Sequence, residues 1–240
     1  LGDRRALLGS LDNWRRTIES GKSTGGLDKF QSQAFETLTG GVSEAFDLSK
    51  EDPKVLARYD TSTLMDVEKI RKKWNNRPRY QNHVNNLGKL MLMARRLAER
   101  GAGFITVTTD FVWDMHADAN NATMTEGMQY VGRPFDHAVS AFIEDVEARG
   151  LSEKILLVCC GEMGRTPRVN KKAGRDHWGG SAPLMLYGGG LKMGQVIGSS
   201  TKDGGEPAND RVTIPNLYAT LMETVLDTGA VRAMAGIPKD

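Results

Sequence analysis

Two short polar clusters contain the side chains best suited to chemistry. In the first, Asp114 and His116 stand two positions apart, a few residues after the apolar, β-branched run at residues 104–109. Residues i and i+2 of an extended segment point to the same side, so a carboxylate and an imidazole are presented together. Such oxygen and nitrogen ligands suit zinc or manganese ions. A chance Asp-x-His pair is the alternative interpretation.

The second cluster contains Glu162 and His177 in a loop punctuated by glycine and proline. It follows residues 155–160, an apolar run that predicts a buried strand. Two structural alternatives stay open, because Glu162 can pair with Arg165 and His177 can pack on Trp178 at the surface.

Four candidate ligands therefore follow successive predicted strands. They are Asp114, His116, Glu162 and His177. Loops at the carboxyl ends of parallel strands meet at one sheet edge, so we expect these side chains to converge on one divalent metal ion. The planar guanidinium groups of Arg165 and Arg175 match a phosphate or sulfate oxyanion and are the candidate catalytic residues. The combination predicts metal-assisted hydrolysis of such esters.

Periodicity predicts the elements that position these loops. Helices are predicted at residues 4–18, 27–38, 43–48, 84–100, 123–149 and 215–226, with a turn or short helix from Pro53. Strands are predicted at residues 104–109, 155–160, 184–187 and 195–198. Strand–helix–strand alternation is typical of βαβ units, so we expect an α/β fold with a mostly parallel sheet in residues 83–240. Residues 1–82 would form a helical insertion or cap before it.

The bulk composition is that of an ordinary globular protein. The 240 residues are 39% hydrophobic and 26% charged, with a net charge of +2. This balance gives no reason to expect nucleic-acid binding, which needs a concentrated basic face. No apolar run is long enough to predict a membrane span. His83 and His137 are predicted at the surface, and the sequence does not indicate an oligomeric state.

Several motifs carry a resemblance to a known family. They are Ala94-Arg95-Arg96-Leu97, Trp113-Asp114-Met115-His116, Gly161-Glu162-Met163-Gly164-Arg165-Thr166-Pro167, Gly174-Arg175-Asp176-His177-Trp178 and the glycine-rich residues 188–198. They resemble the bacterial DUF1501 family, a sulfatase-like branch of the alkaline phosphatase superfamily.

The resemblance implies an alkaline-phosphatase-like α/β/α sandwich, in which Asp114, His116 and His177 bind zinc, calcium, magnesium or manganese. It also implies an anionic small-molecule or glycan ester as substrate and a periplasmic or extracellular setting.

Two departures from the superfamily pattern favour other interpretations. Met163 stands where the superfamily has a metal-binding histidine, and nothing at the start of the chain matches the element that carries the nucleophile. We therefore expect the chain to be the C-terminal part of a hydrolase. The alternatives are a non-catalytic protein that binds an anionic sugar or a partner through the same scaffold, and a structural fragment without a ligand.

Overall fold

The computed structural model describes residues 43–109 and 113–234. They belong to two units, residues 1–50 and residues 51–240. In the first unit, helix α3 (Ser43–Ala45) confirms a short helix at the predicted place and is followed by the 3-10 turn η2 (Leu48–Lys50). The helices predicted at residues 4–18 and 27–38 lie outside the described residues.

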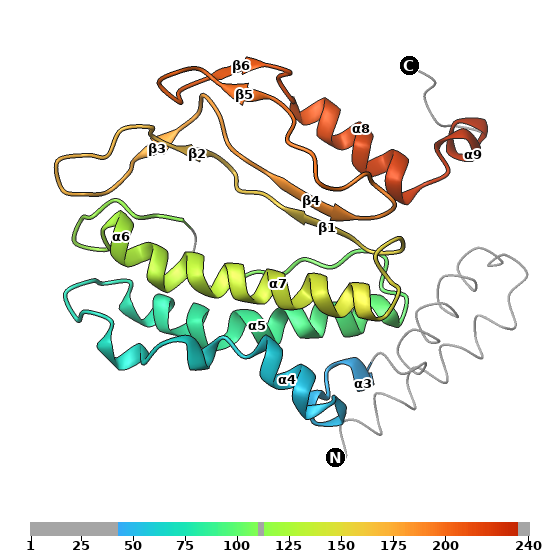
Figure 1. Cartoon of the computed structure of the whole chain (residues 1–240), viewed down its shortest axis with the longest axis horizontal. Helices are drawn as coiled ribbons and strands as arrows, with labels where there is room; N and C mark the ends of the chain where they lie inside the picture. Colours follow the sequence, from blue (N-terminus) through green and yellow to red (C-terminus); the bar gives the residue numbers. More distant parts are fainter. Residues whose placement is uncertain (1–42, 110–112, 235–240) are drawn as a thin grey trace, which may run out of the picture. The chain divides into compact units, whose positions relative to one another are not determined.

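The second unit begins with a group of helices. In chain order they are α4 (Pro53–Tyr59), the 3-10 turns η3 (Ser62–Leu64) and η4 (Val67–Lys69), α5 (Arg77–Glu99), α6 (Met124–Gly127), the π-helix η5 (Met128–Gly132) and α7 (Arg133–Ala148). Helices α5 and α7 lie side by side, and α4 contacts both (Figure 1). Their facing sides are apolar, because Val84 and Met91 of α5 and Phe142 and Val146 of α7 are buried. No helix among the described residues has the length and apolar character needed to cross a bilayer.

A charged network fixes the same helices at one end. The guanidinium of Arg95 is only 1% exposed and contacts Glu51 at 2.6 Å and Asp145 at 2.7 Å. Arg149 pairs with the same two carboxylates, at 3.3 and 2.7 Å. A buried charge is tolerated only when it is paired, so these contacts tie the start of α4 to α5 and α7.

The strands contradict the predicted sheet. They are β1 (Leu156–Cys159), β2 (Gly164–Arg165), β3 (His177–Trp178), β4 (Met185–Gly188), β5 (Ser199–Ser200) and β6 (Pro207–Asn209). They pair as β1–β4, β2–β3 and β5–β6, and each pair is antiparallel. The prediction of a mostly parallel, alkaline-phosphatase-like α/β/α sandwich is therefore wrong for this structure.

The reason lies in the connection between β1 and β4. Parallel neighbours need a crossover, usually a helix, but this connection contains the β2–β3 hairpin instead. The chain therefore returns antiparallel, with Leu156 opposite Gly188 and Cys159 opposite Met185. The Tyr187 hydroxyl of β4 donates to Glu147 Oε1, in the last turn of α7, at 2.6 Å.

The predictions of individual elements were more accurate than the prediction of the sheet topology. Strands β1 and β4 and helix α8 (Ile214–Val225) confirm three predictions, and helix α9 (Thr228–Ala233) follows α8. The strand predicted at residues 104–109 is wrong, because this segment has no strand pairing and Phe104 is 90% exposed. The strand predicted at residues 195–198 is wrong as well, since only the next two residues pair, in β5.

Candidate metal centre

Asp114 and His116 are presented by a buried residue between them. Met115 is 5% exposed and belongs to a core cluster with Trp74, Tyr80 and Tyr130. Because Met115 points into this core, the side chains on either side of it point outward together. The Met115 amide also donates to Trp113 O at 3.0 Å, which stabilises the local turn of the chain.

His177 comes from the β2–β3 hairpin. In this pair His177 lies opposite Arg165, and Gly164 lies opposite Trp178. The Trp178 indole donates to Gly205 O at 2.6 Å, which anchors the hairpin on its other side. Neighbouring strand residues face opposite ways, so the anchored Trp178 leaves His177 and Arg165 on the face that can meet the first cluster.

Backbone hydrogen bonds join the two clusters. The Arg175 amide donates to Met115 O at 2.8 Å, and the Met124 amide donates to Ala173 O at 2.9 Å. The Asn170 side-chain amide adds a bond of 3.1 Å to His116 O. These contacts, rather than a sheet edge, bring the segment before His177 against the segment that carries Asp114 and His116.

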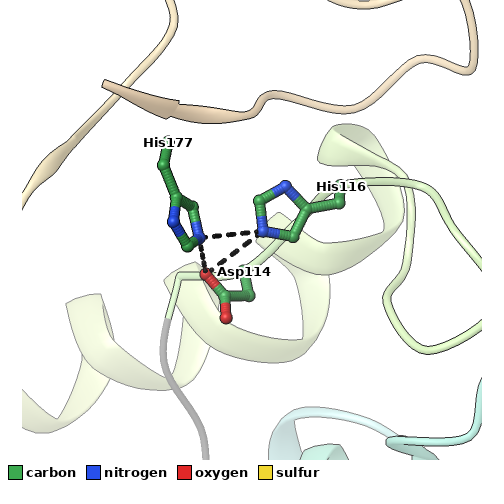
Figure 2. Close-up of side chains that lie close together, drawn as sticks. All are labelled: Asp114, His116 and His177. Carbon is green, nitrogen blue, oxygen red and sulfur yellow. Dashed lines mark hydrogen bonds and ion pairs between the residues drawn. The ribbon is translucent and has the colours of Figure 1, made fainter. Parts of the chain in front are cut away.

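Three of the four predicted ligands converge (Figure 2). His116 Nε2 lies 3.1 Å from His177 Nε2, and the two nitrogens lie 3.5 and 3.2 Å from Asp114 Oδ1. A tetrahedral zinc ion with bonds of about 2.0–2.1 Å separates its ligand atoms by about 3.3–3.4 Å. The observed separations bracket this value, so the donor set and its spacing fit a small divalent ion.

A further carboxylate supports one of the imidazoles. Asp176 Oδ1 lies 3.4 Å from His116 Nδ1, the ring nitrogen that faces away from the converging atoms, and 3.3 Å from the Asn170 side-chain amide. Metal-bound histidines commonly contact a carboxylate in this way, which fixes the ring orientation. The sequence analysis missed Asp176 in this role, although its place beside His177 in the same motif was an available signal.

The chain matches the family model described as "Protein of unknown function (DUF1501)" over residues 2–230. It belongs to this family. No curated protein and no solved structure matches the chain.

In this DUF1501 chain, Arg165 lies against the converging ligands. Its Nη1 is 2.8 Å from Asp114 Oδ1, and the side chain is 16% exposed. Within the described residues, the buried Nε and Nη1 atoms make no directed hydrogen bond. The contact with Asp114 is therefore an ion pair, and Nη2 is the one guanidinium nitrogen of Arg165 that is not among these buried atoms.

Glu162 and Arg175 are not brought to the same point. Glu162 is largely exposed, and its Oε1 lies 3.8 Å from Arg165 Nη2. Arg175 Nη1 donates to Thr166 O at 2.6 Å and to Pro167 O at 2.7 Å, so this guanidinium supports the turn between β2 and β3.

His83, predicted at the surface, is instead buried, with Nδ1 2.7 Å from Thr109 Oγ1. Burial lowers the pKa of His83, which favours the neutral ring. His83 is therefore part of the helical core and not of the DUF1501 candidate site.

Proposed function

We propose that this DUF1501 protein is a metal-dependent hydrolase of phosphate or sulfate esters. The observation that carries the proposal is the triangle formed by Asp114 Oδ1, His116 Nε2 and His177 Nε2, with separations of 3.1 to 3.5 Å. Two imidazoles and one carboxylate are a common ligand set of hydrolytic zinc sites, which keep a further position open for water or substrate. The resemblance to the sulfatase-like branch of the alkaline phosphatase superfamily supports the same chemistry.

Within this proposal, Asp114, His116 and His177 hold the ion, and Asp176 orients His116. A bound divalent ion supplies Lewis-acid polarisation of the ester oxygen. Glu162 is left out of the proposed ligand set because its carboxylate faces Arg165 and solvent.

Arg165 is the proposed oxyanion-binding residue. Its guanidinium lies beside the ligands, Nη2 is outside the buried set, and guanidinium N–H groups form charge-assisted hydrogen bonds to phosphate or sulfate oxygens. Arg175, whose donors are taken by backbone carbonyls, supports the loop rather than the transferred group.

The proposed substrate is an anionic small molecule or a glycan ester. A shallow pocket of about 370 Å³ opens beside His116 and Asp176. Its remaining lining is Asp118, Asn170, Lys171 and Lys172. The charges of the two lysines are balanced by those of the two aspartates, and this polar lining suits a hydroxyl-rich molecule. The anionic group of the proposed substrate is assigned from Arg165 and from the resemblance. The resemblance also supports a periplasmic or extracellular setting.

The test combines metal analysis with hydrolysis of p-nitrophenyl phosphate and p-nitrophenyl sulfate. A Lewis acid contributes several kcal/mol to such reactions, so His116→Ala and His177→Ala should each lower kcat/KM by at least about 100-fold and release the metal. His137→Ala, on helix α7, is the matched control and should keep both the wild-type kcat/KM and the bound metal. Wild-type activity in both site variants, or a purified protein that binds no divalent ion, would contradict the proposal.

A non-catalytic binding protein is the second candidate. Met163 is the observation that favours it, because a thioether is a poor ligand for the hard or borderline ions that hydrolases use, and a histidine is expected there from the resemblance. Metal and phosphate binding without turnover of either ester would favour this candidate.

A further inference from the structure

One carboxylate oxygen faces two different kinds of partner. Asp114 Oδ1 lies 2.8 Å from Arg165 Nη1, and the same atom lies 3.2 Å from His177 Nε2. The oxygen that would bind a metal ion is therefore already paired with a fixed cation.

The guanidinium of Arg165 has little other compensation. The other carboxylate paired with it among the described residues, Glu162, is 60% exposed and 3.8 Å away, where solvent weakens the attraction. Two of its three nitrogens are buried without a directed hydrogen bond in the described part of the chain. The Arg165 charge thus depends mainly on Asp114.

A divalent ion at the triad would disturb this balance. The ion and the guanidinium would share one negative charge at close range, and like charges in a partly buried site repel strongly. A tetrahedral oxyanion removes the conflict, because its oxygens can accept from Arg165 Nη2 and neutralise the ion together.

We infer that metal binding and oxyanion binding at this centre are cooperative, and that Arg165 couples them. Without an oxyanion, Arg165 weakens metal binding; with one, it strengthens metal binding. By linkage, the metal must strengthen oxyanion binding by the same factor. This inference rests on the proposed function. It identifies a doubly charged tetrahedral oxyanion as the ligand that binds together with the metal ion.

Titration of the full 240-residue chain with Mn²⁺ tests the coupling, with free Mn²⁺ followed by electron paramagnetic resonance. Each titration is run without and with inorganic phosphate. We expect phosphate to lower the wild-type Kd for Mn²⁺ by a factor in the usual range of allosteric coupling, about 5- to 150-fold.

Three variants separate the coupling from other effects. Arg165→Gln should bind Mn²⁺ more tightly than the wild type without phosphate and should lose the phosphate effect. Arg165→Lys keeps the positive charge but loses the planar set of guanidinium donors. Without phosphate it should therefore bind Mn²⁺ as weakly as the wild type, and phosphate should change its Kd for Mn²⁺ less. Arg168→Gln removes an exposed cation from the same loop and should behave like the wild type. Circular dichroism checks that each variant is folded.

The outcomes distinguish this inference from the function on which it rests. An equal phosphate effect in wild type and Arg165→Gln overturns the coupling but leaves the metal centre in place. Wild-type Mn²⁺ affinity in Arg165→Gln without phosphate also overturns it. A wild-type protein that binds no Mn²⁺ overturns both the coupling and the metal centre.

Discussion

The substitution Gly174→Ala is the sharpest structural test of how the candidate centre is assembled. A Cβ atom at this buried position would lie 2.3 Å from both the carbonyl carbon and the oxygen of His116, and 2.7 Å from Met115 O. Ordinary contact begins at about 3.4 Å, so the two segments must separate by about 1 Å. The obstructing atoms are backbone, which cannot rotate away as a side-chain tip can.

The flanking hydrogen bonds make this separation costly. Met124 N to Ala173 O and Arg175 N to Met115 O, at 2.9 and 2.8 Å, lie on either side of Gly174. Overpacking of this kind costs about 1–3 kcal/mol of unfolding free energy. Metal sites tolerate only about 0.2 Å in bond length, and misplacement of reacting groups by about 1 Å costs roughly 100-fold in function. We therefore expect the Kd for Mn²⁺ to rise by about 100-fold.

Calorimetric titration with Mn²⁺ measures the effect, and thermal melting by circular dichroism reports the stability. Gly179→Ala is the control, because a Cβ atom there meets nothing within 4 Å and the residue lies only two positions beyond His177. A folded Gly174→Ala protein that binds Mn²⁺ with the wild-type Kd would refute the reasoning. Equal losses in the two variants would refute it as well.

Two further predictions concern carboxylates. Burial raises the pKa of Glu51, but hydrogen bonds from Arg96 and Arg95 outweigh it and lower the pKa from 4.5 to about 2. Glu51 therefore stabilises the fold above about pH 4.5, and this contribution is lost as the pH falls towards 2. Urea unfolding should show that Glu51→Gln lowers stability at pH 7 and that the difference from the wild type shrinks by pH 3; a pH-independent difference would contradict the assignment. Asp176→Asn should raise the Kd for Mn²⁺ about 10-fold or more by freeing the His116 ring, and wild-type affinity by calorimetry would remove Asp176 from the centre.

The predicted elements were mostly correct where local chemistry determines them. Asp52 caps α4 by accepting from the Lys54 amide at 2.7 Å, and Thr123 caps α6 by accepting from the Glu126 amide at 3.3 Å. Caps and amphipathic stripes involve residues a few positions apart, so a single sequence reveals them. Membership of the DUF1501 family, which motifs of four to eleven residues suggested, was confirmed by the family model that matches residues 2–230.

The prediction of a parallel sheet was wrong because strand pairing is not determined by residues close together in the sequence. Residues 104–109 are rich in β-branched side chains, yet strand propensity reflects packing against a partner, and the structure provides none for this segment. Nothing in the run at residues 155–160 distinguishes a parallel partner from an antiparallel one. The direction of β4 depends on the β2–β3 hairpin inserted before it, a segment that was predicted to be a loop.

The convergence at the candidate centre did not depend on the incorrect sheet. Asp114 and His116 come together because the residue between them is buried, so its neighbours on both sides point outward. His177 reaches them through the β2–β3 hairpin and the backbone bonds around Gly174, where the prediction invoked the edge of a parallel sheet. Glu162, whose placement relied on that sheet edge alone, is the one predicted ligand that does not converge. The geometry of the centre is therefore set by the contacts of the hairpin with the segment at residues 113–117, and substitutions that separate these two segments should weaken metal binding even when every ligand is intact.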